Sequence, residues 1–128
     1  MKKLLIPSIF FVLLISFSFA QKPYKVVFYN LENFFDTIND PEVLDDEFTP
    51  DGPKKWNTAK YNKKLNNTER VLFDIAAIDK NYPIVIGVSE VETRGVLEDI
   101  VATPKLAPAN YRIAHFDSPE ARGVDVAF

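Results

Sequence analysis

The stretch Lys25-Val-Val-Phe-Tyr-Asn-Leu-Glu-Asn-Phe-Phe-Asp36 decides how the rest of the chain is interpreted. Its first half is a short β-branched and aromatic run, which predicts a buried strand over residues 26–29. Its second half brings four polar side chains together: Asn30, Glu32, Asn33 and Asp36. Polar groups that follow the end of a core strand are well positioned to face a cleft. The alternative is that the asparagines only turn the chain and cap a helical turn.

A second stretch, Tyr82-Pro-Ile-Val-Ile-Gly-Val-Ser-Glu-Val-Glu92, favours the functional interpretation. It predicts an apolar strand over 84–89, as expected of a sheet covered on both faces, with Glu90 at its end. Between the two strands, apolar residues recur at spacings of three and four over 58–80, which predicts a helix. If the strands pair in parallel, Asn30 and Glu90 lie at the same edge of one sheet. A glutamate there is costly to desolvate unless it meets a cation or hydrogen-bond donors.

Composition limits the classes of protein that fit. The chain has 128 residues, of which 47% are hydrophobic and 26% are charged, so it is long enough to bury a core. Its formal net charge of −3 gives no basic footprint of the kind that nucleic-acid-binding domains often carry. It has no cysteine, which excludes a disulfide framework and a thiolate metal site.

The two ends of the chain carry expectations about processing and length. Residues 1–20 have the order of a secretory signal peptide, with two lysines, an apolar run over 4–15 and small residues ending at Ala20. A membrane anchor is the alternative, but the apolar run is short for a span of about 20 residues. We therefore expect cleavage after Ala20, export as a secreted or periplasmic protein, and no membrane span afterwards. We expect 21–128 to be the N-terminal part of a longer domain, because the sequence stops inside a strand-like run.

The region 37–56 is rich in proline and acidic residues and has no apolar period, which predicts a long loop. A calcium-binding loop with Asp36, Asp40 and Glu47 as ligands would need a glycine where Pro41 stands. A solvated acidic loop is therefore the better interpretation.

The C-terminal third predicts a helix capped by Thr93, followed by a hairpin of two strands, 111–116 and 123–128. The only histidine, His115, lies in the first of these strands, and we expect it to be structural. Asp125 interrupts the second strand, where it is either buried against the site or faces solvent at an edge.

The stretches over 28–36 and 86–92 resemble the first two motifs of the endonuclease/exonuclease/phosphatase superfamily, which includes deoxyribonucleases, bacterial sphingomyelinases and inositol polyphosphate phosphatases. The resemblance implies that Asn30 is the active-site asparagine that ends the first strand and that Glu90 is the glutamate that binds magnesium. It also implies that Glu32 is an acidic residue near the metal. It covers about the first half of the family's domain, and the later Asp-x-Asn motif and terminal Asp-His pair are not in this sequence.

Two arginines are candidates for substrate binding. In deoxyribonuclease-like relatives the connection between the last two predicted strands approaches the substrate, so the resemblance implies that Arg122 pairs with a phosphate, and Arg94 would approach from the loop after Glu90. The alternative for both is a solvated surface position. Mg²⁺ is the implied cofactor, with Mn²⁺ or Ca²⁺ as alternatives, because Mg²⁺ is commonly held by one or two carboxylates plus substrate phosphate.

The expected fold is α/β, the N-terminal half of a two-sheet α/β/β/α sandwich with helices outside. The expected function is that of an exported magnesium-dependent phosphoesterase, a nuclease-like hydrolase of phosphodiesters, in the full-length protein. Its substrate would be a phosphate ester, with nucleic acid as one candidate, and the sequence indicates no protein partner. The alternatives are a non-catalytic binding or surface protein on the same scaffold and a lipid phosphodiesterase. We expect the segment alone to be inactive, because the general base is not in it.

Overall fold

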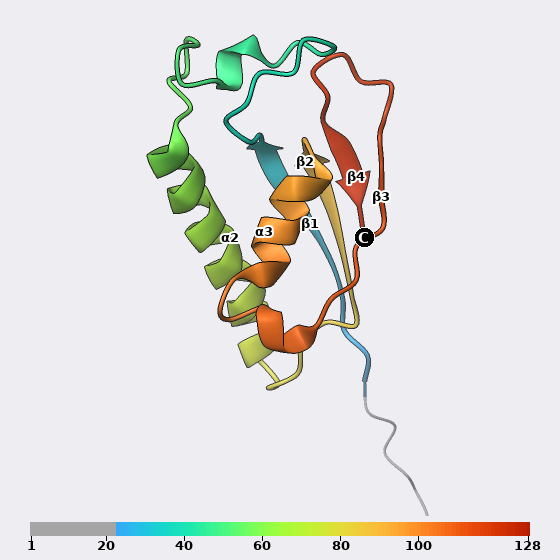
Figure 1. Ribbon diagram of the computed structural model, residues 1–128. Helices are drawn as coiled ribbons and strands as arrows, with labels where there is room; N and C mark the ends of the chain where they lie inside the picture. The colour runs from blue at the N-terminus through green and yellow to red at the C-terminus, as the bar shows by residue number, and fades with distance from the viewer. Residues whose placement is uncertain (1–22) are drawn as a thin grey trace, which may run out of the picture.

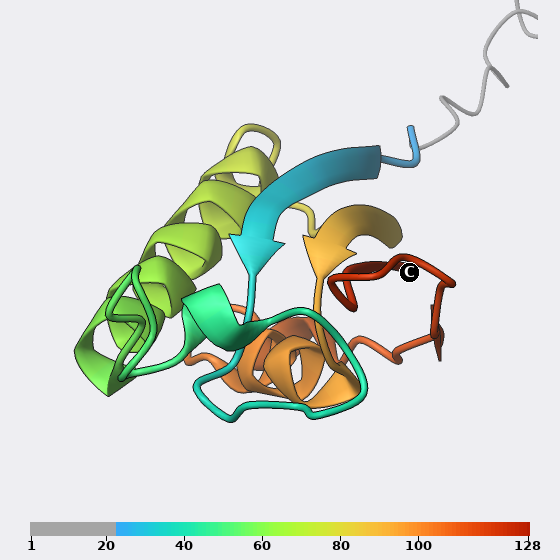
Figure 2. The same ribbon diagram turned by 90° about the horizontal axis from the view of Figure 1, so that it is seen from above.

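The computed structural model describes residues 23–128, so the predicted signal peptide over 1–20 lies outside the described part of the chain. The elements in chain order are β1 (Val26–Phe34), η2 (Asp46–Phe48), α2 (Thr58–Ala77), β2 (Val85–Val91), α3 (Arg94–Ala102), η3 (Ala107–Ala109), β3 (His115–Phe116) and β4 (Asp125–Ala127). They form a mixed α/β structure with one four-stranded sheet, in which both α-helices lie on the same side (Figures 1 and 2). No described helix is long and apolar enough to cross a membrane.

The sheet has the strand order β1-β2-β4-β3. β1 and β2 pair in parallel, with Val26 opposite Val85 and Asn30 opposite Ser89, which confirms the parallel pairing expected from the sequence. β4 is antiparallel to both β2 and β3. The predicted C-terminal hairpin is confirmed, but its strands are shorter than the apolar pattern indicated.

The helices form where the spacing of their apolar residues predicts, and each has a side-chain cap at its N-terminus. The side chain of Asn57 caps α2 by accepting a hydrogen bond from the Lys60 backbone N–H at 3.1 Å. Thr93 caps α3 by accepting from the Val96 N–H at 3.3 Å, as the sequence predicted. The helix α2 ends three residues before the predicted limit, and Ile78, the first residue after it, is exposed.

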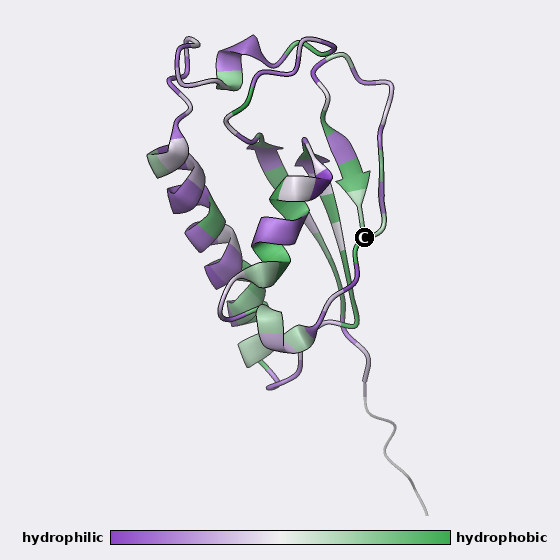
Figure 3. Ribbon diagram, viewed as in Figure 1, coloured by the Kyte–Doolittle hydropathy of each residue, from purple (hydrophilic) through white to green (hydrophobic). Residues whose placement is uncertain are grey.

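The core lies between the sheet and the two helices. It is formed by residues of both helices and of the strands, among them Leu31, Phe34, Leu72, Val88, Val91, Val96, Leu97 and Ile100. Figure 3 shows hydrophobic residues along the strands and hydrophilic residues on much of α2. The core therefore covers one face of the sheet only.

The opposite face of the sheet is apolar and exposed within the described chain, which corrects the expectation that both faces of these strands are covered. Val26 and Phe28, predicted to be buried, are each 68% exposed, and Phe116, Val126 and Phe128 are exposed as well. Phe28 and Phe128 meet over Gly87, where an added Cβ would lie 3.1 Å and 3.2 Å from their rings. The single sheet found here does not by itself confirm the two-sheet sandwich.

The long connection between β1 and α2 is held in place by aromatic contacts. The rings of Phe35 and Phe48 stack with their centroids 3.9 Å apart, and the Trp56 Nε1–H donates to the Phe35 carbonyl at 3.0 Å. The Leu44 N–H donates to the Ala121 carbonyl at 2.8 Å, so this loop contacts the loop before β4. Both loops lie at the end of the sheet to which β1 and β2 point (Figure 1).

Candidate active site

The polar residues of the first two motifs meet at an interruption of the β1–β2 pairing. The regular pairing of β1 with β2 runs from Val26 to Asn30 and resumes where Phe34 lies opposite Val91. Between these points, three residues of β1, Leu31 to Asn33, correspond to a single residue of β2, Glu90. Glu90 also interrupts the pairing of β2 with β4. On that side Ser89 pairs with Val126 and Val91 pairs with Asp125, so Glu90 has no partner residue in β4. The sequence predicted that these polar groups follow the strand ends. Asp36 does follow β1, but Glu32, Asn33 and Glu90 lie in a bulge inside the strands, with Asn30 at its start, because pairing continues beyond them.

Three residues of this bulge adopt left-handed backbone conformations. Glu32, Asn33 and Glu90 have φ angles of 55°, 59° and 60°. This region is unfavourable for residues other than glycine, and such conformations often occur at functional sites. Their buried neighbours Leu31 and Phe34, both almost fully excluded from solvent, fix the bulge against the core. The unusual backbone is therefore supported by ordinary packing.

The Glu90 carboxylate is held by two hydrogen-bond donors from β1. Asn30 Nδ2 donates to Glu90 Oε1 at 2.9 Å, and the Asn33 backbone N–H donates to Glu90 Oε2 at 3.0 Å. Asn30 Oδ1 accepts from the Glu32 N–H at 2.6 Å, which fixes the orientation of the Asn30 amide. Each oxygen of an ionised carboxylate has two lone pairs, so each Glu90 oxygen keeps one for a further donor or a cation.

The structure brings Arg122 to this site. Its Nη1 donates to Asn33 Oδ1 at 2.9 Å, and its Nε donates to Glu120 Oε1 at 2.9 Å. The neighbouring Glu120 carboxylate and, to a smaller extent, the charge of Glu90 raise the pKa of Arg122. The guanidinium therefore lies at the rim of the bulge as a permanent positive charge.

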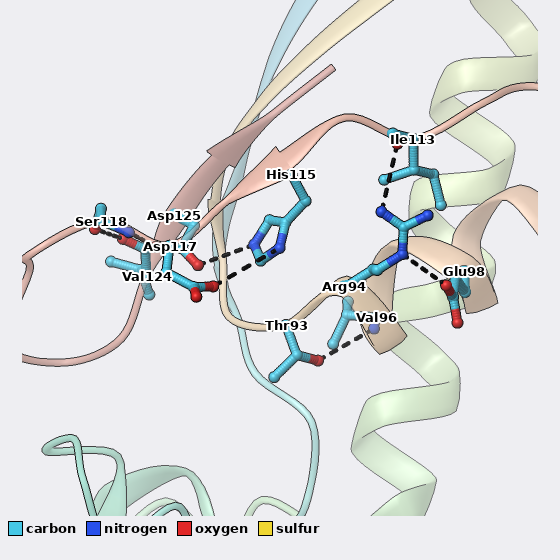
Figure 4. A network of polar contacts seen from close by, with 10 residues as sticks. All are labelled: Thr93, Arg94, Val96, Glu98, Ile113, His115, Asp117, Ser118, Val124 and Asp125. Atoms are coloured by element: carbon cyan, nitrogen blue, oxygen red, sulfur yellow. Dashed lines mark hydrogen bonds and ion pairs between the residues drawn. The ribbon is translucent and has the colours of Figure 1, made fainter.

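Arg94, the other predicted substrate contact, is engaged elsewhere. Its Nε donates to Glu98 Oε1 at 2.9 Å, one turn along α3, and its Nη1 donates to the Ile113 carbonyl at 3.4 Å (Figure 4). Neither partner belongs to the bulge, so the structure does not bring Arg94 together with Asn30 and Glu90.

Lys64 of α2 is a site residue that the sequence reasoning missed. Nothing in the sequence distinguishes Lys64 from the other lysines of the helix, but it is half-buried, and its Nζ donates to the carbonyls of Glu32 at 2.6 Å and Asn33 at 3.4 Å. Burial lowers its pKa, while the charges of Glu32 and Glu90 oppose that shift. We name Asn30, Glu32, Asn33, Lys64, Glu90 and Arg122 the bulge cluster.

A second group of carboxyls lies next to the bulge cluster and is more buried. Asp45 is 1% exposed, and Glu92 accepts a hydrogen bond from the Asp36 N–H at 2.6 Å. Burial, with the charges of Asp36 and Asp45 and a hydrogen bond to Asp45, raises the pKa of Glu92 to about 8. The loop over 37–56 was expected to be a solvated acidic loop, but its Asp45 is buried, and Asp45 Oδ2 accepts from the Asp40 N–H at 2.9 Å.

Chemically, the bulge cluster combines oxygen ligands with donors for an anion. The carboxylates of Glu90 and Glu32 could hold a hard divalent cation, which prefers oxygen ligands. Arg122 and Asn30 could contact the oxygens of a phosphate. A sequence pattern could have located Asn30 and Glu90 but not Lys64, whose contact depends on how α2 packs beside β1.

A sequence model of the endonuclease/exonuclease/phosphatase family matches residues 25–128. No curated protein matches the chain, and no solved structure does.

Proposed function

The chain belongs to the endonuclease/exonuclease/phosphatase family, and from this premise we propose that the full-length protein is an exported, magnesium-dependent phosphoesterase that hydrolyses phosphodiesters as a nuclease does. Family members are typically hydrolases of phosphoesters, and the match spans all four strands and both α-helices. Export rests on the signal-peptide pattern of residues 1–20.

One observation carries the proposal: Glu90 is fixed by Asn30 and Asn33 with both of its oxygens still able to accept. No ion pair within residues 23–128 neutralises this carboxylate. The two hydrogen-bond donors offset part of the cost of burying this anion, and a bound cation would complete its environment. The donor set therefore fits a divalent metal, with Glu90 as the principal ligand and Glu32 as a second.

The residues of the bulge cluster have distinct proposed roles. Mg²⁺ bound there would polarise the phosphate ester and offset the charge that develops on its oxygens. Asn30 orients the Glu90 carboxylate through Nδ2 without adding a negative charge beside it. Arg122 binds a phosphate oxygen. His115 does not join the cluster in the described structure, so we propose that the general base comes from another part of the full-length protein.

The exposed apolar face of the sheet supports the finer proposal about the fold. Val26, Phe28, Val126 and Phe128 are exposed, and apolar side chains of this kind on a sheet can pack against a second sheet. We propose that further strands of the full-length protein cover this face and complete a two-sheet sandwich, with residues 21–128 as its N-terminal portion.

A membrane-surface phosphodiesterase is the second candidate. Ile38 and Leu44 of the loop next to the site are 74% and 67% exposed, so apolar side chains at the rim could contact lipid. Rates on DNA, on phospholipid vesicles and on a small phosphodiester separate the substrate classes.

The experiment that tests the proposal compares the full-length protein with its Glu90→Gln variant. Glutamine keeps the shape but removes the charge, so Mg²⁺ affinity should fall and turnover should drop by on the order of a hundredfold, while the melting temperature changes little. Glu42→Gln, at an exposed position of the loop, is the control and should leave both quantities unchanged. An unchanged magnesium titration in Glu90→Gln would remove Glu90 from the site. A protein inert on all three substrates would favour a non-catalytic scaffold.

A further inference from the structure

A buried histidine–aspartate pair lies on β3 and β4, outside the bulge cluster. His115 Nε2 is 2.9 Å from Asp125 Oδ2, and their side chains are only 8% and 4% exposed (Figure 4). His115 lies opposite the buried Ala127 in the β3–β4 pairing, and paired residues point to the same face. The pair therefore lies on the side of the sheet that the helices cover, which resolves the open question about Asp125 in favour of burial.

The short contacts of the His115–Asp125 pair are explained better by hydrogen bonds than by a bound metal ion. Ligand atoms of His115, Asp117 and Asp125 lie within 4.8 Å of one another, a spacing that a cation could bridge. However, Asp125 Oδ2 is at hydrogen-bond distance from His115, and Asp125 Oδ1 accepts from the Ser118 N–H at 2.6 Å. The Asp117 side chain is 97% exposed and 4.0 Å from His115 Nδ1. One oxygen of the buried carboxylate thus contacts His115, and the other holds the start of the loop that follows β3.

The loop that Asp125 holds leads directly to Arg122. The Ser118 hydroxyl donates to the Val124 carbonyl at 2.9 Å and accepts from the Glu120 N–H at 3.2 Å, which closes the loop on itself. The Glu120 carboxylate then accepts from the Arg122 backbone N–H and from Arg122 Nε, both at 2.9 Å. Arg122 Nη1 reaches Asn33 in the bulge. An unbroken series of contacts therefore joins the buried pair to the rim of the candidate site.

We propose that His115 and Asp125 are positioning residues that hold the loop over 117–124 so that Arg122 is presented to a phosphate at the bulge cluster. The inference rests on the proposed function, because it assigns Arg122 a phosphate. Loops that bind ligands are otherwise among the least stable parts of a protein, and ordering one before binding lowers the entropic cost of binding. His115 thus has a structural role, as the sequence indicated, but one that acts on substrate binding.

The test uses His115→Leu, His115→Gln and Arg122→Met in the full-length protein. Leucine keeps an apolar volume but removes the donor to Asp125, whereas glutamine can still donate from its side-chain amide. His115→Leu should raise KM for a phosphodiester roughly tenfold with kcat nearly unchanged, because it weakens binding of ground state and transition state alike. His115→Gln should restore most of the affinity.

A double-mutant cycle separates positioning from a general loss of stability. If His115 acts through Arg122, His115→Leu should raise KM little further in the Arg122→Met background. If it raises KM by the same factor in both backgrounds, the inference is wrong. The inference is also wrong if Zn²⁺ or Mn²⁺ binds the wild type but not His115→Gln and the KM depends on that metal. His115, Asp117 and Asp125 would then be a metal site.

Hydrogen exchange gives a readout that needs no activity. The backbone amides of Leu44 and Arg122 donate to Ala121 and Glu120, and both should exchange faster in His115→Leu than in wild type. If these amides exchange faster in His115→Leu but the wild type has no phosphoesterase activity, the positioning role stands and the proposed function is wrong. Unchanged exchange in an active protein would overturn the positioning alone.

Discussion

Asn30 reaches across the parallel β1–β2 pairing and donates from Nδ2 to Glu90 over 2.9 Å, while its Oδ1 accepts from the Glu32 N–H over 2.6 Å. One amide side chain therefore fixes both carboxylate-bearing positions proposed to hold the metal. An aspartate has almost the same shape but could only accept.

The first prediction concerns Asn30 itself. Asn30→Asp keeps the acceptor for Glu32 but places a negative charge where Glu90 now finds a donor. The added carboxylate should tighten Mg²⁺ binding, and turnover should fall by on the order of a hundredfold because the Glu90 carboxylate loses its orientation. Asn30→Ala should lower both the affinity for Mg²⁺ and the turnover. Calorimetric Mg²⁺ titration and turnover of the full-length variants measure these effects, and wild-type turnover in Asn30→Asp would contradict this role.

The second prediction concerns Lys64, which holds the left-handed residues of β1 from the neighbouring helix. Lys64→Met keeps the aliphatic length but leaves the carbonyls of Glu32 and Asn33 without this donor. The free energy of unfolding should fall by about 1–2 kcal/mol. Lys63→Met is the matched control, because Lys63 is exposed on the same turn and should cost less than about 0.5 kcal/mol. If urea denaturation gives the same loss of unfolding free energy for Lys64→Met and Lys63→Met, Lys64 is an ordinary surface lysine.

The third prediction concerns the pH dependence that Glu92 confers. Its ordinary pKa is 4.5, and in the folded chain burial raises this pKa to about 8. The folded state then holds more protons than the unfolded state between these values. The stability contributed by protonated Glu92 is complete below pH 4.5 and is lost as pH rises through about 8, by up to about 1.4 kcal/mol per pH unit.

Glu92→Gln isolates this contribution. Glutamine imitates the protonated acid, because its oxygen can accept from the Asp36 N–H and its amide can donate to Asp45. The variant should match the wild type near pH 4.5 and be more stable than it near pH 8, as measured by denaturant unfolding at both pH values. An identical pH profile in Glu92→Gln would show that another group is responsible.

The fourth prediction concerns the open face of the sheet. In the full-length protein Phe28→Lys should lower the free energy of unfolding by about 3 kcal/mol, since it would bury an unpaired charge between two sheets. In the isolated segment 23–128 it should reduce aggregation without that loss. Ile78 is exposed beyond the end of α2, so Ile78→Lys should change neither the free energy of unfolding nor the aggregation of the segment. Similar stability of Phe28→Lys and wild type in the full-length protein would show that no second sheet covers this face.

The sequence was sufficient for the parts of the fold that depend on short-range pattern. The two apolar runs, the helical period between them and the Thr93 cap predict β1, β2, α2 and α3, and parallel pairing brings Asn30 and Glu90 together. Family membership was predicted from the same motifs. The catalytic and metal roles of these residues stay predictions.

The features that the sequence did not predict depend on long-range contacts. The left-handed conformations of Glu32, Asn33 and Glu90 arise because β1 and β2 resume pairing beyond the bulge, which no local propensity encodes. Lys64 resembles its helix neighbours in sequence and differs only in facing β1. Asp45 is buried because the loop over 37–56 folds back onto Phe35, a contact set by tertiary packing.

The strand order β1-β2-β4-β3 has a consequence for the order in which the sheet can form. β2 pairs on one side with β1, which precedes it, and on the other with Asp125–Ala127, which come after α3 and β3. Until β4 has docked, β2 has an unpaired edge. A folding chain in which β4 is delayed would therefore be exposed to binding by chaperones or by other chains.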